Sequence, residues 1–288
     1  MNFQRETALS HILERVEKIP PVPAIVRKVI DIVQKPEVAI QEIVKVVMLD
    51  ESLTFRVLRA ANSAYYRRGG PESKTVQEAL IRLGNNALVN LVIAESCSPL
   101  FKNAGEGYEL KRGELWRHSM GCALLSQQIA AFTGFQKAEN LFTAAIVHDL
   151  GKTLLDNFVH ARRAALHERM TQFKMTYTEA EFEVLGMHHG EIGARLLEKW
   201  SFAPDITEAV RFHHDPLHAP SAVQDLVFHV YLSDMVCMML GVGLGLDGLA
   251  YPANREIWDY FKMSESDFQR FSLMLLEELA KAEEWLRT

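Results

Sequence analysis

The sequence has little of what marks secreted, membrane-spanning or disulfide-stabilised proteins. It contains three cysteines, Cys97, Cys122 and Cys237, an odd number without a CxxC pair, which argues against a disulfide framework and favours a reducing compartment. No apolar run reaches about 18 residues, so we expect no transmembrane helix. The first residues, MNFQRETALSHILERVEKI, are polar and amphipathic and lack the apolar centre of a signal peptide. These absences predict a cytoplasmic protein with no membrane partner.

An excess of basic residues is also missing. The chain of 288 residues has 31 Lys and Arg against 37 Asp and Glu, which gives a formal net charge of −6, and the two signs alternate along it. This balance gives no reason to expect a nucleic-acid polymer as partner, and most charged residues are expected on solvated helix faces. The hydrophobic content of 48% is that of an ordinary globular protein.

Strand-like alternation between hairpin turns is absent, and nearly every segment shows helical periodicity instead. In VPAIVRKVIDIV, for example, Val22, Ile25, Val29 and Ile32 share one helix face. The sequence therefore predicts an all-α protein, a packed helical bundle with short loops.

Two irregular stretches divide this helical pattern. The first, FKNAGEGYELKRG, residues 101–113, combines two glycines with mixed charges, and it predicts a boundary between residues 1–108 and residues 109–288. The second, residues 241–256, precedes a C-terminal helix that we expect near residues 264–286.

The segment AAIVHDLGK is apolar but holds His148, Asp149 and Lys152. As a continuous helix it would place His148 and Lys152 on one stripe, with Asp149 about 100° around the axis. Because a buried carboxylate costs several kcal/mol unless it is paired, hydrogen-bonded or coordinated, such a pair needs a compensating partner. One candidate partner is Lys152, as an ordinary buried ion pair; the other is a metal ion.

Similar ionisable groups recur on the inner faces of other predicted helices. Taken singly, such residues are more simply explained as histidines of the core or as caps of helix ends. We expect His229 to be a structural histidine of this kind. Asp234 is the only charged side chain between Leu226 and Leu240, so it should have a cationic partner. The remaining candidates on inner helix faces or at helix ends are His118, His189, His213 and His214.

Together these residues gather imidazoles and carboxylates on the inner faces of five helices, an arrangement by which helical bundles commonly hold metal ions. Mixed nitrogen and oxygen ligands suit iron, manganese or zinc better than calcium or magnesium. We therefore predict a divalent metal site of one or two ions.

The order of His118, then His148-Asp149, then Asp234 resembles the H…HD…D signature of the HD phosphohydrolase superfamily, whose HDxGK run ends here at Lys152. The N-terminal segments KIPPVPAIVRKVIDIV, MLDESLTFRVLRAANSAYY and VQEALIRLGNNALVNLVI are similar to the HDOD domain, a bacterial signalling relative of the HD-GYP phosphodiesterases. The resemblance covers roughly residues 10–240. It implies an HD-domain-like fold with an N-terminal helical subdomain.

The resemblance also implies roles for individual residues. His118, His148, Asp149 and Asp234 would hold one ion. His189, followed by Gly193, and the pair His213-His214 are similar to the extra ligands of HD-GYP proteins and would help hold a second ion. Lys152 would contact the phosphate of a substrate, and with Asp149 it is the candidate catalytic residue.

One departure concerns activity. The Gly-Tyr-Pro loop of HD-GYP proteins is absent, because HHDPLHAPSAVQ runs straight into the next predicted helix, which argues against cyclic-di-GMP hydrolysis. HDOD domains often act without catalysis. We therefore expect a regulatory signalling protein that acts by binding a partner, an unidentified signalling protein. The alternative is a metal-dependent phosphohydrolase or phosphodiesterase acting on a nucleotide or another phosphoester ligand, which the complete set of ligand-type residues favours.

Overall fold

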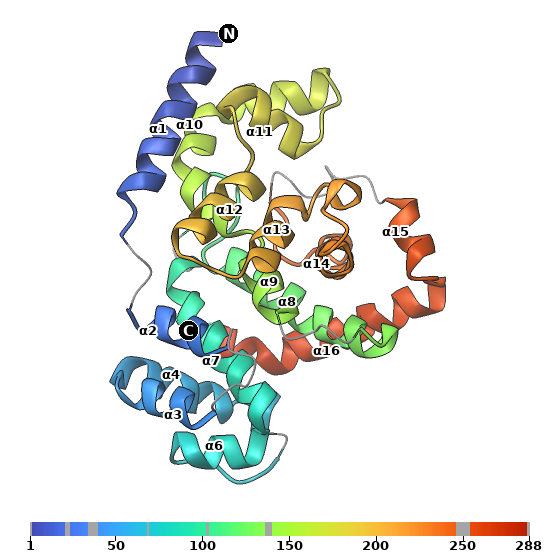
Figure 1. Cartoon of the computed structure of the whole chain (residues 1–288). Helices are drawn as coiled ribbons and strands as arrows, with labels where there is room; N and C mark the ends of the chain where they lie inside the picture. Colours follow the sequence, from blue (N-terminus) through green and yellow to red (C-terminus); the bar gives the residue numbers. More distant parts are fainter. Residues whose placement is uncertain are drawn as a thin grey trace. The chain divides into compact units, whose positions relative to one another are not determined.

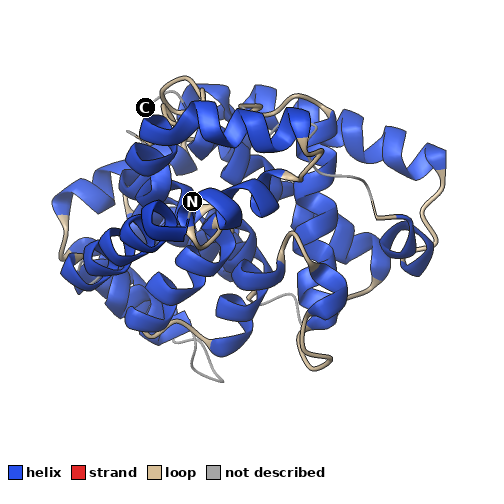
Figure 2. Ribbon diagram, turned by 90° about the horizontal axis from the view of Figure 1, so that it is seen from above, coloured by secondary structure: helices blue, strands red, loops and turns tan. Residues whose placement is uncertain are grey.

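A computed structural model of the chain shows helices joined by short loops (Figures 1 and 2). It describes residues 2–20, 24–33, 40–67, 69–101, 104–135, 140–245 and 254–286. Within these ranges there is no strand, so the predicted all-α class is confirmed. The predicted C-terminal helix is present as α16, Glu265–Leu286, whereas the predicted irregular stretch before it falls partly outside the described residues.

The helices follow one another in this order: α1 (Asn2–Lys18), α2 (Ala24–Val33), α3 (Ile40–Met48), α4 (Glu51–Ala61), α5 (Ala64–Arg67), α6 (Val76–Leu83), α7 (Asn85–Phe101), α8 (Glu114–Thr133) and α9 (Leu141–Val147). The second half of the chain forms α10 (Leu150–Gln172), α11 (Tyr177–Leu185), α12 (His189–Lys199), α13 (Pro204–Phe212), the 3₁₀ turn η1 (Pro216–His218), α14 (Gln224–Met239), α15 (Arg255–Tyr260) and α16.

The chain divides into two compact units, which differ from the sequence-based division at both ends of the chain. The first unit comprises residues 1–20 and 100–275, and the second comprises residues 21–99 and 276–288. Helix α1 belongs to the first unit because it packs against α10, α11 and α12. Its end is fixed by Lys199, whose Nζ donates to the carbonyl oxygen of Val16 at 2.8 Å, and by the indole of Trp200, which donates to that of Pro20 at 3.2 Å. The division into subdomains between residues 108 and 109 stays a prediction.

The second unit is a small helical layer in which α3 packs against α2, α4 and α6. Its helices begin where the sequence supplies a capping side chain. Asp50 accepts a hydrogen bond from the Leu53 amide at the start of α4, and Thr75 accepts one from the Glu78 amide at the start of α6. Such caps satisfy amides that have no partner inside the helix, and each stabilises its helix by about 1 kcal/mol.

In the first unit, α14 is the central helix. It packs against α8, α9 and α13, while α12 packs against α10 and α13 (Figure 1). Every residue from Leu226 to Met238 is buried, so α14 has apolar contacts on all sides rather than along one stripe. A single carboxylate in such a helix, Asp234, therefore faces protein wherever it points.

Two glycines allow α10 and α12 to approach closely. A Cβ atom on Gly151 would clash with the backbone carbonyl oxygen of His189, and one on Gly193 would lie 3.0 Å from Cγ1 of Val210 and 3.1 Å from the Gly151 nitrogen. The glycine of the HDxGK run is thus required by packing. It brings the start of α10, next to Asp149, against the start of α12 at His189.

We predict that Gly151→Ala lowers the free energy of unfolding by about 1–3 kcal/mol or more, because the two helices must separate to admit the methyl group. Gly121→Ala in α8 is the matched control, since a Cβ there meets its nearest atom, Sγ of Cys237, at an ordinary 3.4 Å. Chemical denaturation of both variants measures the difference. An equal loss of stability in the two variants would contradict the close-approach explanation.

Candidate metal centre

His148 and Asp149 lie in a turn between two helices, which corrects the expectation of one continuous helix. Helix α9 ends at Val147 and α10 begins at Leu150, and Asp149 has φ −94° and ψ 11°, outside helical values. This break matters because adjacent residues of a regular helix point about 100° apart. The turn lets both side chains face the same interior region, where neither is more than 1% exposed.

Each of the other predicted ligands is also placed in the interior by its helix. His118 lies within α8 and Asp234 within α14. His189 is the first residue of α12, and His213 follows the last residue of α13, as the sequence predicted. We call His118, His148, Asp149, His189, His213, His214 and Asp234 the HD cluster. No side chain of this set is more than 6% exposed.

Four imidazoles of the HD cluster are oriented in the same way. Each places Nδ1 on a fixed acceptor, so that Nε2 is the nitrogen that faces the centre. The Nδ1 acceptors are the carbonyl oxygens of Val242 for His118 (2.8 Å), Ala145 for His148 (2.7 Å) and Val210 for His213 (2.6 Å), and the Glu181 carboxylate for His189 (2.7 Å).

The inward-facing atoms form two groups. In the first, Nε2 of His118 lies 2.9 Å from Oδ1 of Asp234, and Nε2 of His148 lies 3.8 Å from the same oxygen. Cys122, one turn after His118, adds its sulfur, and all ligand atoms of this group lie within 4.8 Å of one another. Cys122 was not among the ligands predicted from the sequence.

The second group contains Asp149 and three histidines. Oδ1 of Asp149 lies 3.5 Å from Nε2 of His189 and 3.8 Å from Nε2 of His213, and Nε2 of His214 lies 3.0 Å from that of His189. The second carboxylate oxygen, Oδ2, lies 3.7 Å from Nε2 of His118 and 3.5 Å from Nε2 of His148. Asp149 therefore stands between the two groups, rather than only with the first as the sequence comparison implied.

Four buried atoms of the HD cluster have no hydrogen-bond partner: Nε2 of His148, Oδ1 of Asp149, Nε2 of His213 and Oδ2 of Asp234. Buried polar atoms are nearly always satisfied, and leaving one unsatisfied costs about 1–3 kcal/mol. All four are atoms of residues in the two groups. Nitrogen and oxygen donors arranged in this way fit a divalent transition-metal ion.

Comparison with known proteins gives the family. The profile of the HDOD domain matches residues 19–216. The chain belongs to the HDOD domain family. An HDOD domain protein of unknown function from Geobacter sulfurreducens is 27% identical, with a TM-score of 0.74, and the match covers 100% of this chain and 97% of that one.

Two other relatives bear on the fold and the length. A Shewanella amazonensis protein named "Putative phosphohydrolase" is 22% identical, with a TM-score of 0.67 and coverage of 96% of this chain and 95% of that one, which shows the same fold. An uncharacterized protein of Treponema pallidum is 21% identical over 274 residues, which are 95% of the HDOD chain and 52% of that protein. The HDOD chain thus spans about half the length of this curated relative. Among the described helices of the HDOD chain, none combines the length and the apolar character that a membrane span requires.

Electrostatics set His118 apart from three other imidazoles of the HD cluster. Burial opposes protonation of His118, but the hydrogen bond and charge of Asp234 raise its pKa to about 9, so this histidine is the cationic partner expected for Asp234. Burial lowers the pKa of His148, His213 and His214, and these rings are held neutral, as metal binding requires. Burial alone would raise the pKa of Asp149, but Lys152 and the surrounding imidazoles hold it well below its usual value.

Lys152 is buried, and its Nζ donates to Oδ2 of Asp149 at 2.8 Å. The ion pair that was the alternative to a metal is therefore present, but it uses one carboxylate oxygen only. The other oxygen, Oδ1, is the unpartnered atom that faces His189 and His213.

Glu181 is a site residue that the sequence analysis missed. Its Oε2 accepts hydrogen bonds from both Nδ1 and the backbone amide of His189, and its Oε1 accepts one from Oη of Tyr108 at 2.6 Å. The sequence pattern could have identified it, because Glu181 lies on the same face of α11 as Tyr177 and Leu185. A lone carboxylate on a buried face needs a partner, just as Asp234 does. Tyr108 is positioned in turn by Asp156, whose Oδ1 accepts hydrogen bonds from the amides of Gly105 and Gly107.

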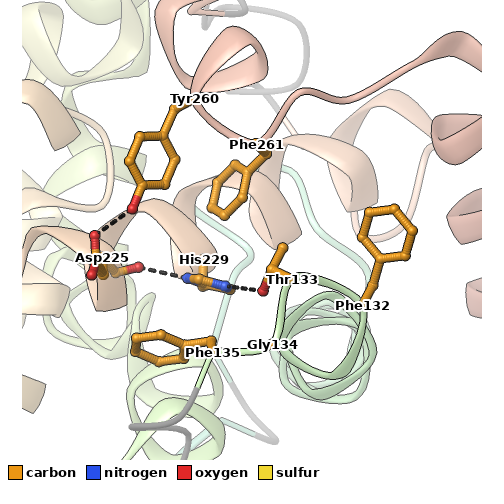
Figure 3. Close-up of a pocket in the computed structure, with 8 residues that line it drawn as sticks. All are labelled: Phe132, Thr133, Gly134, Phe135, Asp225, His229, Tyr260 and Phe261. Atoms are coloured by element: carbon orange, nitrogen blue, oxygen red, sulfur yellow. Dashed lines mark hydrogen bonds between the residues drawn. The ribbon is translucent and has the colours of Figure 1, made fainter.

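His229 lies outside the HD cluster, in the wall of a cavity of about 490 Å³ between α8, α14 and α15 (Figure 3). Its Nδ1 donates to the Asp225 carbonyl oxygen at 2.6 Å, its Nε2 lies 2.9 Å from the Thr133 hydroxyl, and its ring stacks on Phe135 with centroids 4.3 Å apart. Figure 3 shows the ring lying flat against Phe135, with both nitrogens engaged. These contacts account for His229 as a satisfied structural histidine.

We predict that Tyr108→Phe lowers the free energy of unfolding by about 1–3 kcal/mol, because Oε1 of Glu181 loses its donor inside the protein. Tyr260→Phe makes the same chemical change in a half-exposed tyrosine, whose hydroxyl donates to the exposed Asp225, and it should cost far less. Parallel urea denaturation of the two variants provides the measurement. Similar losses of stability in the two variants would mean that the buried Tyr108–Glu181 hydrogen bond contributes no more than the exposed one.

Proposed function

We propose that this HDOD protein is a regulatory protein that binds divalent metal ions in the HD cluster and acts through partner binding. The observation that carries the metal is the set of four buried ligand atoms without hydrogen-bond partners. His118, His148 and Asp234 would hold one ion, and His189, His213 and His214 would hold a second. Asp149 has one oxygen toward each group, and Oδ1, which has no hydrogen-bond partner, would join the second. Iron, manganese and zinc suit this donor set.

Burial supports a regulatory role over a catalytic one. The ligands come from α8, the α9–α10 turn, α12, α13 and α14, so an ion bound there links most of the first unit together. Lys152, the residue that would contact a substrate phosphate, is held by Asp149 and is only 4% exposed. A metal in such a place acts on the stability and shape of the unit, which a signalling partner can recognise.

The partner class has support from one relative. A Marinobacter aquaeolei protein named "Putative signal transduction protein" shares the fold, with a TM-score of 0.77 and 17% identity, and the match covers 100% of this chain and 66% of that one. We propose a protein partner of this signalling class for the HDOD chain.

Phosphohydrolase activity is the second candidate, and it is favoured by Asp149 standing between two groups of ligand atoms. Two bound ions would supply Lewis-acid activation of a phosphoester and of a water molecule. Lys152 would then have to leave Asp149 to reach the substrate. The phosphohydrolase names of the Shewanella amazonensis relatives are in line with this alternative.

Metal should stabilise the native chain by mass action, by about 2.7 kcal/mol when the free ion is at 100 times its dissociation constant. We predict that zinc or manganese added to metal-free protein raises the melting temperature, and that Asp234→Asn abolishes most of this rise. Asp215→Asn, which changes a carboxylate that is 63% exposed beside the cluster, should leave the rise intact. Differential scanning calorimetry measures all three proteins, and an equal rise in wild type and Asp234→Asn would remove Asp234 from the ligands.

The regulatory proposal and the phosphohydrolase alternative differ in whether the metal-loaded protein hydrolyses phosphoesters. We predict that metal-loaded protein hydrolyses none of a panel of phosphomonoesters, nucleotides and cyclic dinucleotides above the rate of a Asp149→Asn control, because Lys152 and the metal ligands are buried. Phosphate release or nucleotide chromatography provides the measurement. Turnover that Asp149→Asn abolishes would replace the regulatory proposal with the phosphohydrolase.

A further inference from the structure

Cys122 has a position that the H…HD…D pattern does not explain. It lies in α8, one turn after His118, is fully buried, and its Sγ is 3.6 Å from Nε2 of His118. The sulfur, Nε2 of His118, Nε2 of His148 and a carboxylate oxygen of Asp234 all lie within 4.8 Å of one another. These four atoms come from three separate parts of the chain and converge on one point.

A second observation at the same point indicates a missing partner. Nε2 of His148 and Oδ2 of Asp234 have no hydrogen-bond partner, although His148 is 0% and Asp234 1% exposed. The thiol does not satisfy them, since its neighbours are Nε2 of His118 and the thiol of Cys237. A cation would engage the nitrogen, the oxygen and the sulfur together.

We propose that Cys122 is a protein ligand of the ion in the first group, where its thiolate completes a set of four donors with His118, His148 and Asp234. This inference rests on the proposed metal binding. Coordination would replace the S–H bond of Cys122 and the Nε2–H bond of His118, which is protonated while it pairs with Asp234, by bonds to the metal, and both protons would leave to solvent. Asp149 then serves the second group, with His189, His213 and His214, and keeps its ion pair with Lys152.

The distance between Cys122 and His118 fits zinc. Bonds of about 2.3 Å to sulfur and about 2.0–2.1 Å to nitrogen in tetrahedral geometry place the two ligand atoms about 3.5 Å apart. The distance from Sγ of Cys122 to Nε2 of His118 is 3.6 Å. A site closed by four protein ligands is typical of structural zinc, whereas catalytic zinc keeps an open position. The Cys122 ligand therefore favours a structural ion in the first group.

The second buried cysteine of this region, Cys237, serves as an internal control. It lies in α14, three residues after Asp234, and its thiol hydrogen-bonds that of Cys122, but it is not part of the converging group. Cys97, also buried, belongs to the second unit. A soft thiolate ligand selects zinc, cobalt or iron over manganese and magnesium, so the three cysteines should differ in their effect on metal preference.

The test uses cobalt(II) chloride added to the metal-free full chain, followed by absorption spectroscopy. Wild type should develop a near-ultraviolet thiolate-to-cobalt charge-transfer band together with visible ligand-field bands. Cys122→Ser should lose the charge-transfer band, while the ligand-field bands from the nitrogen and oxygen donors remain. Cys237→Ser and Cys97→Ser should keep both.

The zinc affinity of Cys122→Ser should fall by at least about tenfold, since even partners outside the ligand shell commonly contribute 10–100-fold. Its manganese affinity should change less.

The outcomes separate the two proposals. Cobalt bound by wild type without a thiolate band overturns the Cys122 ligand and leaves the metal-binding proposal standing. A band that survives in Cys122→Ser but disappears in Cys237→Ser assigns the thiolate to Cys237 and overturns the inference. No bound cobalt overturns both. If Cys122→Ser does not fold, zinc X-ray absorption of Cys237→Ser decides, because a sulfur neighbour at about 2.3 Å then supports the inference and its absence rejects it.

Discussion

The burial of the HD cluster is the constraint on which the first unit depends. Seven ionisable side chains lie in the interior of a helical unit, and their ligand atoms form two groups, within each of which the atoms lie no more than 4.8 Å apart. Low local polarity makes an unpaired charge there expensive, so each group must be oriented by protein contacts and compensated at the centre. The helix ends, the glycines and the Nδ1 hydrogen bonds all serve this arrangement.

The orientation is built mainly from the backbone. Carbonyl oxygens of Ala145, Val210 and Val242 receive the Nδ1 hydrogens of three imidazoles, and these carbonyls lie at or near helix ends, where they lack partners within the helix. His189 differs, since a carboxylate, Glu181, accepts its Nδ1 hydrogen. The orientation of His189 therefore depends on Glu181, then on Tyr108, and through Asp156 on the loop around residues 104–113. A carboxylate partner also makes the imidazole a stronger metal ligand.

The same burial relates the two candidate functions. Catalysis on a phosphoester needs an open coordination position and a mobile Lys152, whereas a structural ion needs a closed donor set. In the described structure Lys152 is paired with Asp149, and Cys122 supplies a fourth donor to the first group. Both features point toward an ion that shapes the protein, and both can be changed by single substitutions without altering the rest of the ligand set.

The sequence alone determined the all-α class, because helical periodicity is a local property of side-chain spacing. It also determined the ligand-type residues, because a charged group on an otherwise apolar stripe can be seen without a structure. It did not determine that a turn separates α9 from α10 at His148 and Asp149, since both residues are compatible with a helix and the break depends on how α10 packs against α12 through Gly151. Nor did it group Cys122 with His118 and Asp234, or Glu181 with His189, since these contacts join segments far apart in the chain. Only the tertiary structure decides which buried atoms face one another, because the distance between them is set by helix packing and not by sequence spacing.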